Sequence, residues 1–282
     1  MADNPGFGVL LTRLLNRRQT DIAWLASACG IPEGELRAVT DGASPSPSQL
    51  EVLAATLGFH TADLYVIAGL PVPEPFQPCE PATGHQLRPL IEITMALPAD
   101  QRTHVRETAD QLPQLPHIHP ADPPRTYYKN DGGFGAMLVT LLCANRNLHS
   151  PSAAARILGD LGGVYLAAST INSIGGGRVP LKPIWLVGFA TTLGVPAADL
   201  AAITDIDISD LDISAVVPPD DPLAAEMAEL LWTSRRLSVS QVEHVRAEAE
   251  AMLVAVPEDA SNDGWNRVYR HHDGTWWGAP RR

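Results

Sequence analysis

The sequence has few cysteines and no long apolar run, and each shortage argues against a class of protein. Three cysteines among 282 residues, Cys29, Cys79 and Cys143, are odd in number and scattered, so neither a disulfide framework nor a CxxC metal site is indicated. No apolar run reaches the roughly 18 to 20 residues that a membrane-spanning helix needs. The N-terminus lacks the basic and apolar regions of a signal peptide. We therefore expect a cytoplasmic protein that contacts no membrane and carries no cofactor.

Positive charge is also scarce. Lys and Arg number 20 against 32 Asp and Glu, which gives a net charge of −12 and a pI of about 5.1. Neutralisation of phosphates by Lys and Arg supplies most non-specific affinity for nucleic acid, so this balance argues against such a partner. Net charge describes the whole chain, however, whereas binding needs only a local face. The charge balance therefore does not exclude nucleic acid.

The periodic segments predict helices. Aromatic residues make up only 6% of the chain, and Ala and Leu dominate segments with helical spacing. The 25 prolines cluster between these segments and indicate linkers. Thr20 is the expected N-cap of the second helix. The helices expected in the first half are residues 7–18, 21–28, 33–40, 48–57 and 61–68, followed by a hairpin of residues 86–97 and 98–112.

The pattern of the first half returns in the second half. Phe134-Gly135 repeats Phe7-Gly8 at an offset of 127 residues, whereas Asp199 repeats Asp63 at an offset of 136. A second hairpin, over residues 223–253, repeats the first at an offset of 140. The growth from 127 to 136 places about nine extra residues in the second copy. We expect most of them in an enlarged turn around residues 160–165.

This enlarged turn precedes a segment with the pattern of a DNA-recognition helix. In residues 168–178 (ASTINSIGGGR), Ile171 and Ile174 lie three residues apart, so a helix here buries one stripe and exposes short polar side chains. Three glycines then stop the helix, and another helix follows over residues 181–193. A short helix with an apolar back, a small polar front and a glycine stop is typical of helix-turn-helix proteins.

Two stretches resemble known families of DNA-binding regulators. Residues 25–58 (LASACGIPEGELRAVTDGASPSPSQLEVLAATLG) resemble the Cro/CI-like (XRE) family, whose compact five-helix domain places its third helix in the major groove. Residues 150–183 (SPSAAARILGDLGGVYLAASTINSIGGGRVPLKP), with the hairpin after them, resemble the EspR-type regulators of actinobacteria. That resemblance implies a long turn before the recognition helix, a hairpin used for dimerisation, and a nucleoid-associated transcription regulator.

We therefore expect an all-α protein built as a tandem repeat of a five-helix helix-turn-helix domain plus a two-helix hairpin. Asp273-Gly274, between two short aromatic runs, predicts a β-hairpin in the tail. The expected boundaries are residues 1–70 (first module), 71–85 (Pro-rich linker), 86–112 (first hairpin), 113–132 (linker), 133–204 (second module), 205–220 (acidic linker), 221–256 (second hairpin) and 257–282 (tail).

The resemblance implies two sets of functional residues. Those expected to contact double-stranded DNA are the polar face of the second recognition helix and nearby basic side chains, with one arginine of the first module: Ser169, Thr170, Asn172, Ser173, Arg178, Lys182, Arg146 and Arg37. Those expected to pair the hairpins, either as a homodimer or as a pseudo-dimer within one chain, are Leu90, Ile91, Val105, Leu112, Leu230, Leu231, Val245 and Met252. For Arg13, Arg17 and Arg18 of the first module a solvated surface position is expected, with phosphate contact as the alternative.

The rival hypothesis is a protein-interaction module. The expected recognition helix of the first module begins with Glu33, Gly34 and Glu35. DNA phosphates would repel the carboxylates of Glu33 and Glu35. An acidic first module fits a protein partner, such as a sigma factor or another regulator. The tail, with four arginines from residue 261 onward, is either a nucleic-acid-binding arm or a segment that docks its tryptophans on the core.

No arrangement typical of an enzyme is recognised. Gly175-Gly176-Gly177 lacks the preceding strand and the following Lys-Ser/Thr of a P-loop, and no nucleophile with a base is evident. His117 and His119, in a Pro-rich linker, lack the further ligands that a metal would need. The acidic run at residues 205–212 lacks the glycine and bidentate acid of a calcium loop and is expected to be a solvated linker.

Overall fold

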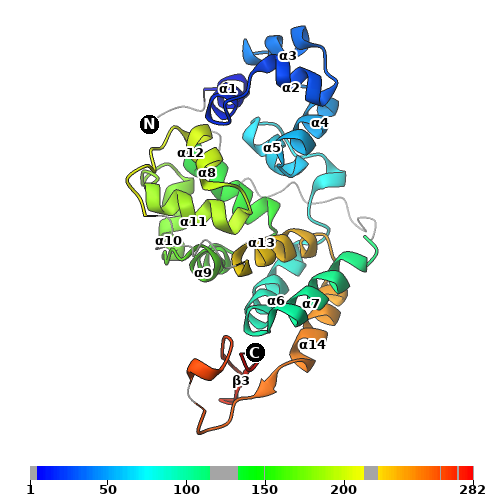
Figure 1. Cartoon of the computed structure of the whole chain (residues 1–282), viewed down its shortest axis with the longest axis vertical. Coiled ribbons are helices and arrows are strands. Elements are labelled where there is room, and N and C mark those ends of the chain that lie inside the picture. The colour runs from blue at the N-terminus through cyan, green and yellow to red at the C-terminus, as the bar shows by residue number, and fades with distance from the viewer. Residues whose placement is uncertain are drawn as a thin grey trace.

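A computed structural model describes residues 5–114, 133–148, 150–212, 222–260, 262–271 and 273–281. The chain is mostly helical, as the sequence predicts, with fourteen α-helices and a small sheet in the described part. Figure 1 shows an elongated molecule with α1–α5 at the top, α8–α12 to the left of the centre, the hairpins below, and the sheet at the lower end.

The first module contains five short helices, with the predicted bounds met to within one residue at each end: α1 (Phe7–Arg17), α2 (Ile22–Cys29), α3 (Glu33–Thr40), α4 (Pro47–Leu57) and α5 (Thr61–Ile67). The predicted N-cap of α2 is wrong by one residue. Asp21 accepts the hydrogen bond from the Trp24 amide (2.7 Å), whereas the Thr20 hydroxyl donates back to the carbonyl of Leu15. Ser46 opens α4 with a capping box to Gln49.

The second module follows the same order of helices: α8 (Gly133–Thr140), continued by a π-helical turn η4 (Leu141–Asn145), then α9 (Pro151–Gly162), α10 (Ala168–Gly175), α11 (Pro183–Leu193) and α12 (Ala197–Thr204). The expectation that most of the extra residues enlarge the turn is wrong. α9 has 12 residues against 8 in α2, so the helix itself takes four of the extra residues. The turn after it, residues 163–167, exceeds residues 30–32 by only two.

Glycine lets α8 pack directly on α10. A Cβ atom on Gly135 would lie 2.3 Å from the carbonyl oxygen of Ile174, a buried residue in the last turn of α10. Gly8 has the same place in the first module, where a Cβ atom would lie 2.3 Å from the carbonyl oxygen of Val39 in α3. The repeated Phe-Gly pair therefore marks a close approach of two helix backbones, which a larger residue would push apart.

The two hairpins pack against each other within the chain. They comprise α6 (Gly84–Ala96) followed by α7 (Ala99–Gln111), and α13 (Leu223–Ser234) followed by α14 (Val239–Ala251). α6 and α7 each pack on both α13 and α14, more closely than the two helices of either pair pack on each other. The linker before α6 holds two short 3-10 turns, η1 (Glu74–Phe76) and η2 (Pro81–Thr83). Arg102 in α7 donates to Glu226 in α13 (2.6 Å) across this contact, with both side chains largely buried.

This packing buries the expected pairing residues inside the chain. Six of them are at most 1% exposed inside the chain, and the other two pack partly buried against the same core: Leu90, Ile91, Val105, Leu230, Leu231 and Val245, then Leu112 and Met252. As a homodimer surface the prediction is wrong, because the partner hairpin of the same chain already covers these side chains. Within this chain the two hairpins bury these side chains against each other.

The tail forms the predicted β-hairpin. β2 (Tyr269–Arg270) pairs antiparallel with β3 (Trp276–Gly278), and Gly274 between them has a φ of 92°. An unpredicted strand, β1 (Val254–Ala255), pairs with the other edge of β3, and a 3-10 turn, η6 (Asn262–Gly264), lies between. Asn266 donates to the carbonyl of Leu97 (2.6 Å), which attaches the sheet to the first hairpin.

No single helix in the described ranges is long and apolar enough to cross a membrane. By length and composition α4 and α5 pass that test as a pair, but they are bent by 113° at their junction.

Candidate nucleic-acid interface

α10 has the two-sided character that the sequence predicts. Ile171 and Ile174 are fully buried against α8 and α9. On the other side Ser169 is exposed, while Thr170 and Asn172 are partly exposed. Ser173 is also partly exposed. The buried stripe fixes the rotation of the helix, and this rotation turns hydroxyl and amide groups outward.

The backbone after α10 forms a tight C-terminal cap. Gly177 has a φ of 66°, in the left-handed region that favours glycine. The amide groups of Arg178 and Val179 then donate to the carbonyl of Ser173 (2.8 and 3.2 Å). This cap leaves the Arg178 side chain exposed immediately beyond the helix.

Positive charge flanks α10, and no carboxylate lies on it. Arg178 and Lys182 are both exposed, and the Lys182 ammonium lies 4.8 Å from the ring centre of Trp185 at the start of α11. α10 itself (ASTINSIG) has no acidic residue. Its surface is therefore neutral along the helix and positive at the C-terminal end.

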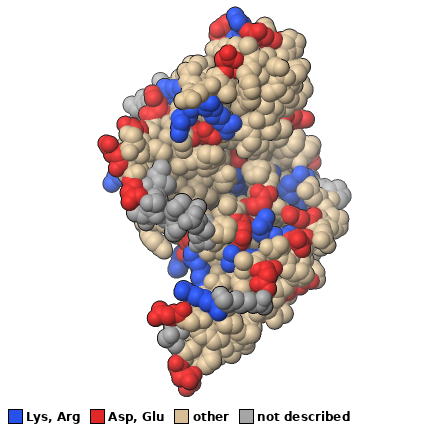
Figure 2. All heavy atoms as spheres, viewed as in Figure 1, with Lys and Arg blue, Asp and Glu red and all other residues tan. Residues whose placement is uncertain are grey.

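The corresponding helix of the first module has the opposite charge. Glu33 and Glu35 occupy the first turn of α3, and Arg37 pairs with Glu33 one turn away. Figure 2 shows acidic side chains beside basic ones at the top of the molecule, where α3 lies. The positive charge of Arg37 is therefore already balanced, which weakens its case as a phosphate contact.

Arg146 is not a DNA contact, contrary to the prediction. Its side chain is 0% exposed and pairs with Asp63 of the first module. It also donates to the carbonyl of Leu193 (2.8 Å), and its guanidinium carbon lies 4.7 Å from the ring centre of Trp232. Because this arginine sits between the two modules and the second hairpin, a phosphate cannot reach it.

Two residues near α10 were missed by the sequence reasoning. Tyr165 is 82% exposed in the turn before α10, and a Cβ atom on Gly159 would touch its ring. The small residue therefore lets the ring lie along α9. Arg156 is exposed on α9. The signal available in the sequence for Tyr165 was an aromatic residue between a Gly-Gly pair and α10.

Arg156 belongs to a cluster of positive charge around one half-buried carboxylate. Burial raises the pKa of Asp160 in α9, while Arg88, Arg267 and Arg156 act in the opposite direction. Figure 2 shows basic side chains gathered at the left edge of the molecule, between the region of α9 and the C-terminal sheet. The tail thus brings its own basic residue, Arg267, to the side of the molecule where α9 and α10 lie.

The tail has features of both hypotheses that the sequence left open, the nucleic-acid-binding arm and the segment that docks its tryptophans on the core. Trp277 packs partly buried against the core, whereas Trp276 is 49% exposed with the Arg270 guanidinium 5.3 Å from its ring centre. One tryptophan therefore holds the sheet in place, and the other remains on the surface beside an arginine.

Metal ligands are not grouped in the described part of the chain. No cluster of three or more His, Cys, Asp or Glu side chains there could hold an ion. His117 and His119 lie outside the described residues. The acidic run after α12 is tied down at its start, where Asp205 pairs with Arg13 (2.9 Å).

Comparison with known proteins gives no family for this chain: no protein-family model, curated protein or solved structure matches it.

Proposed function

We propose that the chain is a DNA-binding transcription regulator with two helix-turn-helix units, α2–α3 and α9–α10, of which α10 is the principal reader. One observation carries the proposal. α10 buries its isoleucines completely, turns hydroxyl and amide side chains outward, and is followed at its C-terminal end by exposed Arg178 and Lys182 without an intervening carboxylate.

The exposed side chains of α10 match the chemistry of base recognition. An Asn such as Asn172 can pair with the N6 and N7 positions of adenine, and Ser or Thr can contact several bases. Arg178 and Lys182 supply positive charge for phosphates, which position a protein without reading sequence. Tyr165, exposed before the N-terminal end of α10, adds an aromatic surface beside the same helix.

The arrangement of the chain makes the two units act as one body. The hairpins pack on each other, and α1 packs on α12. Figure 1 places α3 at the top and α10 at the left side, with α1 and α12 between them. One chain therefore holds two units in a fixed relation without a second subunit, as a covalent pseudo-dimer.

The test is binding of the full chain to DNA fragments across a salt series, for the native sequence and for an Asn172→Ala, Arg178→Ala double variant. Loss of one good base contact costs about 1–3 kcal/mol, so we expect the double variant to bind selected fragments at least about tenfold more weakly. Arg37→Ala is the matched control, since Glu33 already balances that arginine. Equal binding by the double variant and the native chain would refute the role of α10.

A second candidate function is binding of a protein through the first module. Glu33 and Glu35 at the start of α3 favour this alternative, because a carboxylate there opposes phosphate but suits a basic protein surface. The same salt series distinguishes DNA binding by α10 from protein binding by the first module. No retention of DNA at low salt would favour a protein partner, and a Glu33→Gln, Glu35→Gln variant would then bind that partner more weakly.

A further inference from the structure

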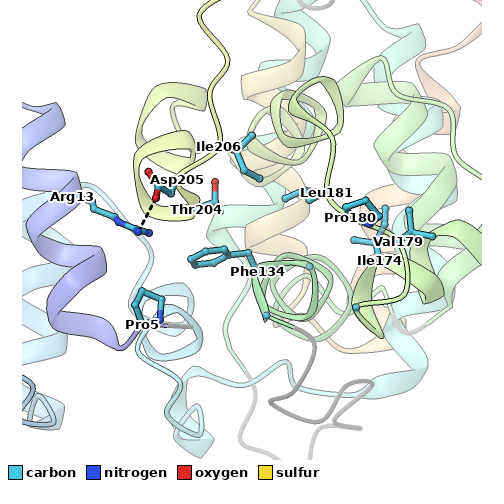
Figure 3. Close-up of a pocket in the computed structure, with 13 residues that line it drawn as sticks. Pro5, Arg13, Phe134, Ile174, Val179, Pro180, Leu181, Thr204, Asp205 and Ile206 are labelled. Carbon is cyan, nitrogen blue, oxygen red and sulfur yellow. Dashed lines mark hydrogen bonds and ion pairs between the residues drawn. The ribbon is translucent and has the colours of Figure 1, made fainter. Parts of the chain in front are cut away.

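An open cavity of about 380 Å³ lies behind the C-terminal end of α10. Figure 3 shows that its walls come from both modules: Pro5 and Arg13 on one side, and α8, α12 and the segment after α10 on the other. A volume of this size is in the range of small-molecule sites in proteins, about 300–1,000 Å³. Such sites occur preferentially where two domains meet, as here.

The cavity has mainly apolar walls. Phe134, at the start of α8, lies in the middle of the view in Figure 3, between Arg13 and Leu181. Ile206 and Val179 extend the apolar lining. All four apolar side chains are partly rather than fully buried. Apolar surface left open to water is what an apolar ligand would cover at a gain in free energy.

The charged residues of the lining are already paired with each other. Arg13 donates to the Asp205 carboxylate (2.9 Å) and, more weakly, to the carbonyl of Ile203 (3.4 Å). The side chain of Thr204 donates to the carbonyl of Leu200 in its own helix (2.8 Å). An ionic ligand would have to displace one member of the Arg13–Asp205 pair, whereas a neutral ligand leaves it intact.

We infer that this cavity is a binding site for an uncharged, largely apolar small molecule. The ligand would lie between α1 of the first module and the α8–α10 contact of the second module. It would touch Ile174 in the last turn of α10 and Gly177 in the cap. Bound there, it contacts the part of α10 that determines the position of Arg178.

This geometry also gives the site a regulatory consequence, which rests on the proposed function. α10 is held from behind by the close contact of Gly135 with the Ile174 carbonyl. A ligand inserted beside that contact would bind with a different free energy to the DNA-free chain and to a chain in which DNA holds the end of α10. By thermodynamic linkage, occupancy then changes DNA affinity, and DNA changes ligand affinity by the same factor.

The binding site is tested without DNA, with the neutral apolar dye N-phenyl-1-naphthylamine and the full chain. We expect saturable fluorescence enhancement at one dye per chain. Leu181→Trp and Ile206→Trp fill the cavity from different walls, and each should weaken dye binding at least about tenfold. Val52→Trp, at an exposed position of α4 outside the cavity, is the control and should bind like the native chain.

Circular dichroism and thermal melting of both variants show whether they remain folded. If one variant does not fold, the other still tests the site. Binding that does not saturate, or that is unchanged in a folded Leu181→Trp or Ile206→Trp variant, would overturn the site. The second arm measures dye affinity with and without DNA. An unchanged affinity would overturn the regulatory role while leaving the site in place, and absence of DNA binding would count against the proposed function alone.

Discussion

Arg18 and Arg146 make the same reciprocal contact from the two halves of the chain. Arg18, at the end of α1, donates to Asp199 of the second module (2.7 Å), and Arg146, just after η4, pairs with Asp63 of the first module. Asp199 follows Asp63 by 136 residues, the offset of the sequence repeat. Each module therefore supplies an arginine to the aspartate of the other.

Each arginine also caps a helix in its own module. Arg18 donates to the carbonyl of Leu57 at the end of α4 (2.8 Å), and Arg146 donates to the carbonyl of Leu193 at the end of α11 (2.8 Å). A cation at a helix C-terminus satisfies a free carbonyl and opposes the negative end of the helix dipole. The interface between modules is therefore built from groups that also end the helices.

The two ion pairs differ in burial, which predicts different losses on mutation. The Arg146 and Asp63 side chains are 0% and 2% exposed, whereas Arg18 is 26% exposed. Removal of one partner from a buried pair costs about 3–5 kcal/mol because the other charge is left unpaired. Arg146→Met should therefore lower the free energy of unfolding by about that amount, and Arg18→Met by about 1 kcal/mol. Urea denaturation measures both.

An Asp63→Asn, Arg146→Met double variant provides the control for this prediction. Neither variant residue carries a charge, so no unpaired charge is left buried. The double variant should therefore lose less unfolding free energy than the sum of the losses of the two single variants. Two results would contradict this explanation. One is an equal loss of unfolding free energy for Arg146→Met and Arg18→Met. The other is a loss in the double variant equal to the sum of the losses for Arg146→Met and Asp63→Asn, which would mean that an unpaired buried charge does not cause the loss.

The burial of His60 leads us to expect that the stability of the chain depends on pH. Its ring stacks on Trp232 with centroids 3.6 Å apart and an interplanar angle of 9°. The pKa of His60 is lowered to about 4, chiefly by burial; Asp63 acts in the opposite direction, and Arg146 and Arg235 add to the lowering. The unfolded chain, with a histidine pKa near 6.5, binds a proton at higher pH than the folded chain. The contribution of neutral His60 to the free energy of unfolding is therefore fully present above about pH 6.5 and is lost as the pH falls towards 4.

The expected loss over that window is about 3 kcal/mol, from the difference between the two pKa values. His60→Phe keeps a flat ring on Trp232 but cannot be protonated. Its stability should fall less than that of the native chain between pH 6.5 and pH 4 in urea titrations at each pH. Parallel curves for the two proteins would assign the acid sensitivity to other groups.

Two glycines predict opposite effects of the same substitution. Gly135→Ala places a Cβ atom 2.3 Å from the Ile174 carbonyl oxygen, so α8 and α10 must separate. We expect a loss of about 1–3 kcal/mol together with weaker DNA binding. Gly34, inside α3, has nothing within 4 Å of such an atom, and Gly34→Ala should stabilise the chain by about 1 kcal/mol. Thermal melting compares the two, and a neutral Gly135→Ala would contradict the packing argument.

The helices could be predicted because their signals are local. α3 has the bounds Glu33–Thr40 that its periodicity predicts, and a proline at the first position and a glycine after the end mark α4. The partners of isolated charges could not be predicted. Asp63 lies 83 residues before Arg146, so nothing near Arg146 indicates that it is buried. Arg18 was expected on the solvated surface for the same reason.

The extra residues of the second module show where a local signal misleads. Gly162-Gly163 predicts a turn, but Gly162 is the last residue of α9. A Cβ atom on Gly162 would lie 2.4 Å from the carbonyl oxygen of Gly188 in α11, so this glycine serves the close packing of two helices. Gly163, with a φ of 65°, ends the helix. Sequence alone does not distinguish a glycine that ends a helix from one that packs.

The salt dependence of DNA binding separates surface arginines from structural ones. Each phosphate contact contributes about 0.9 to the slope of log affinity against log salt. Arg178→Ala and Lys182→Ala, at exposed positions beside α10, should each lower the slope by about that amount. Arg17→Ala, an exposed arginine at the end of α1, is the control and should leave the slope unchanged. Fluorescence anisotropy at four or more salt concentrations gives each slope. A reduced slope for Arg17→Ala with none for Arg178→Ala would move the DNA surface to the first module.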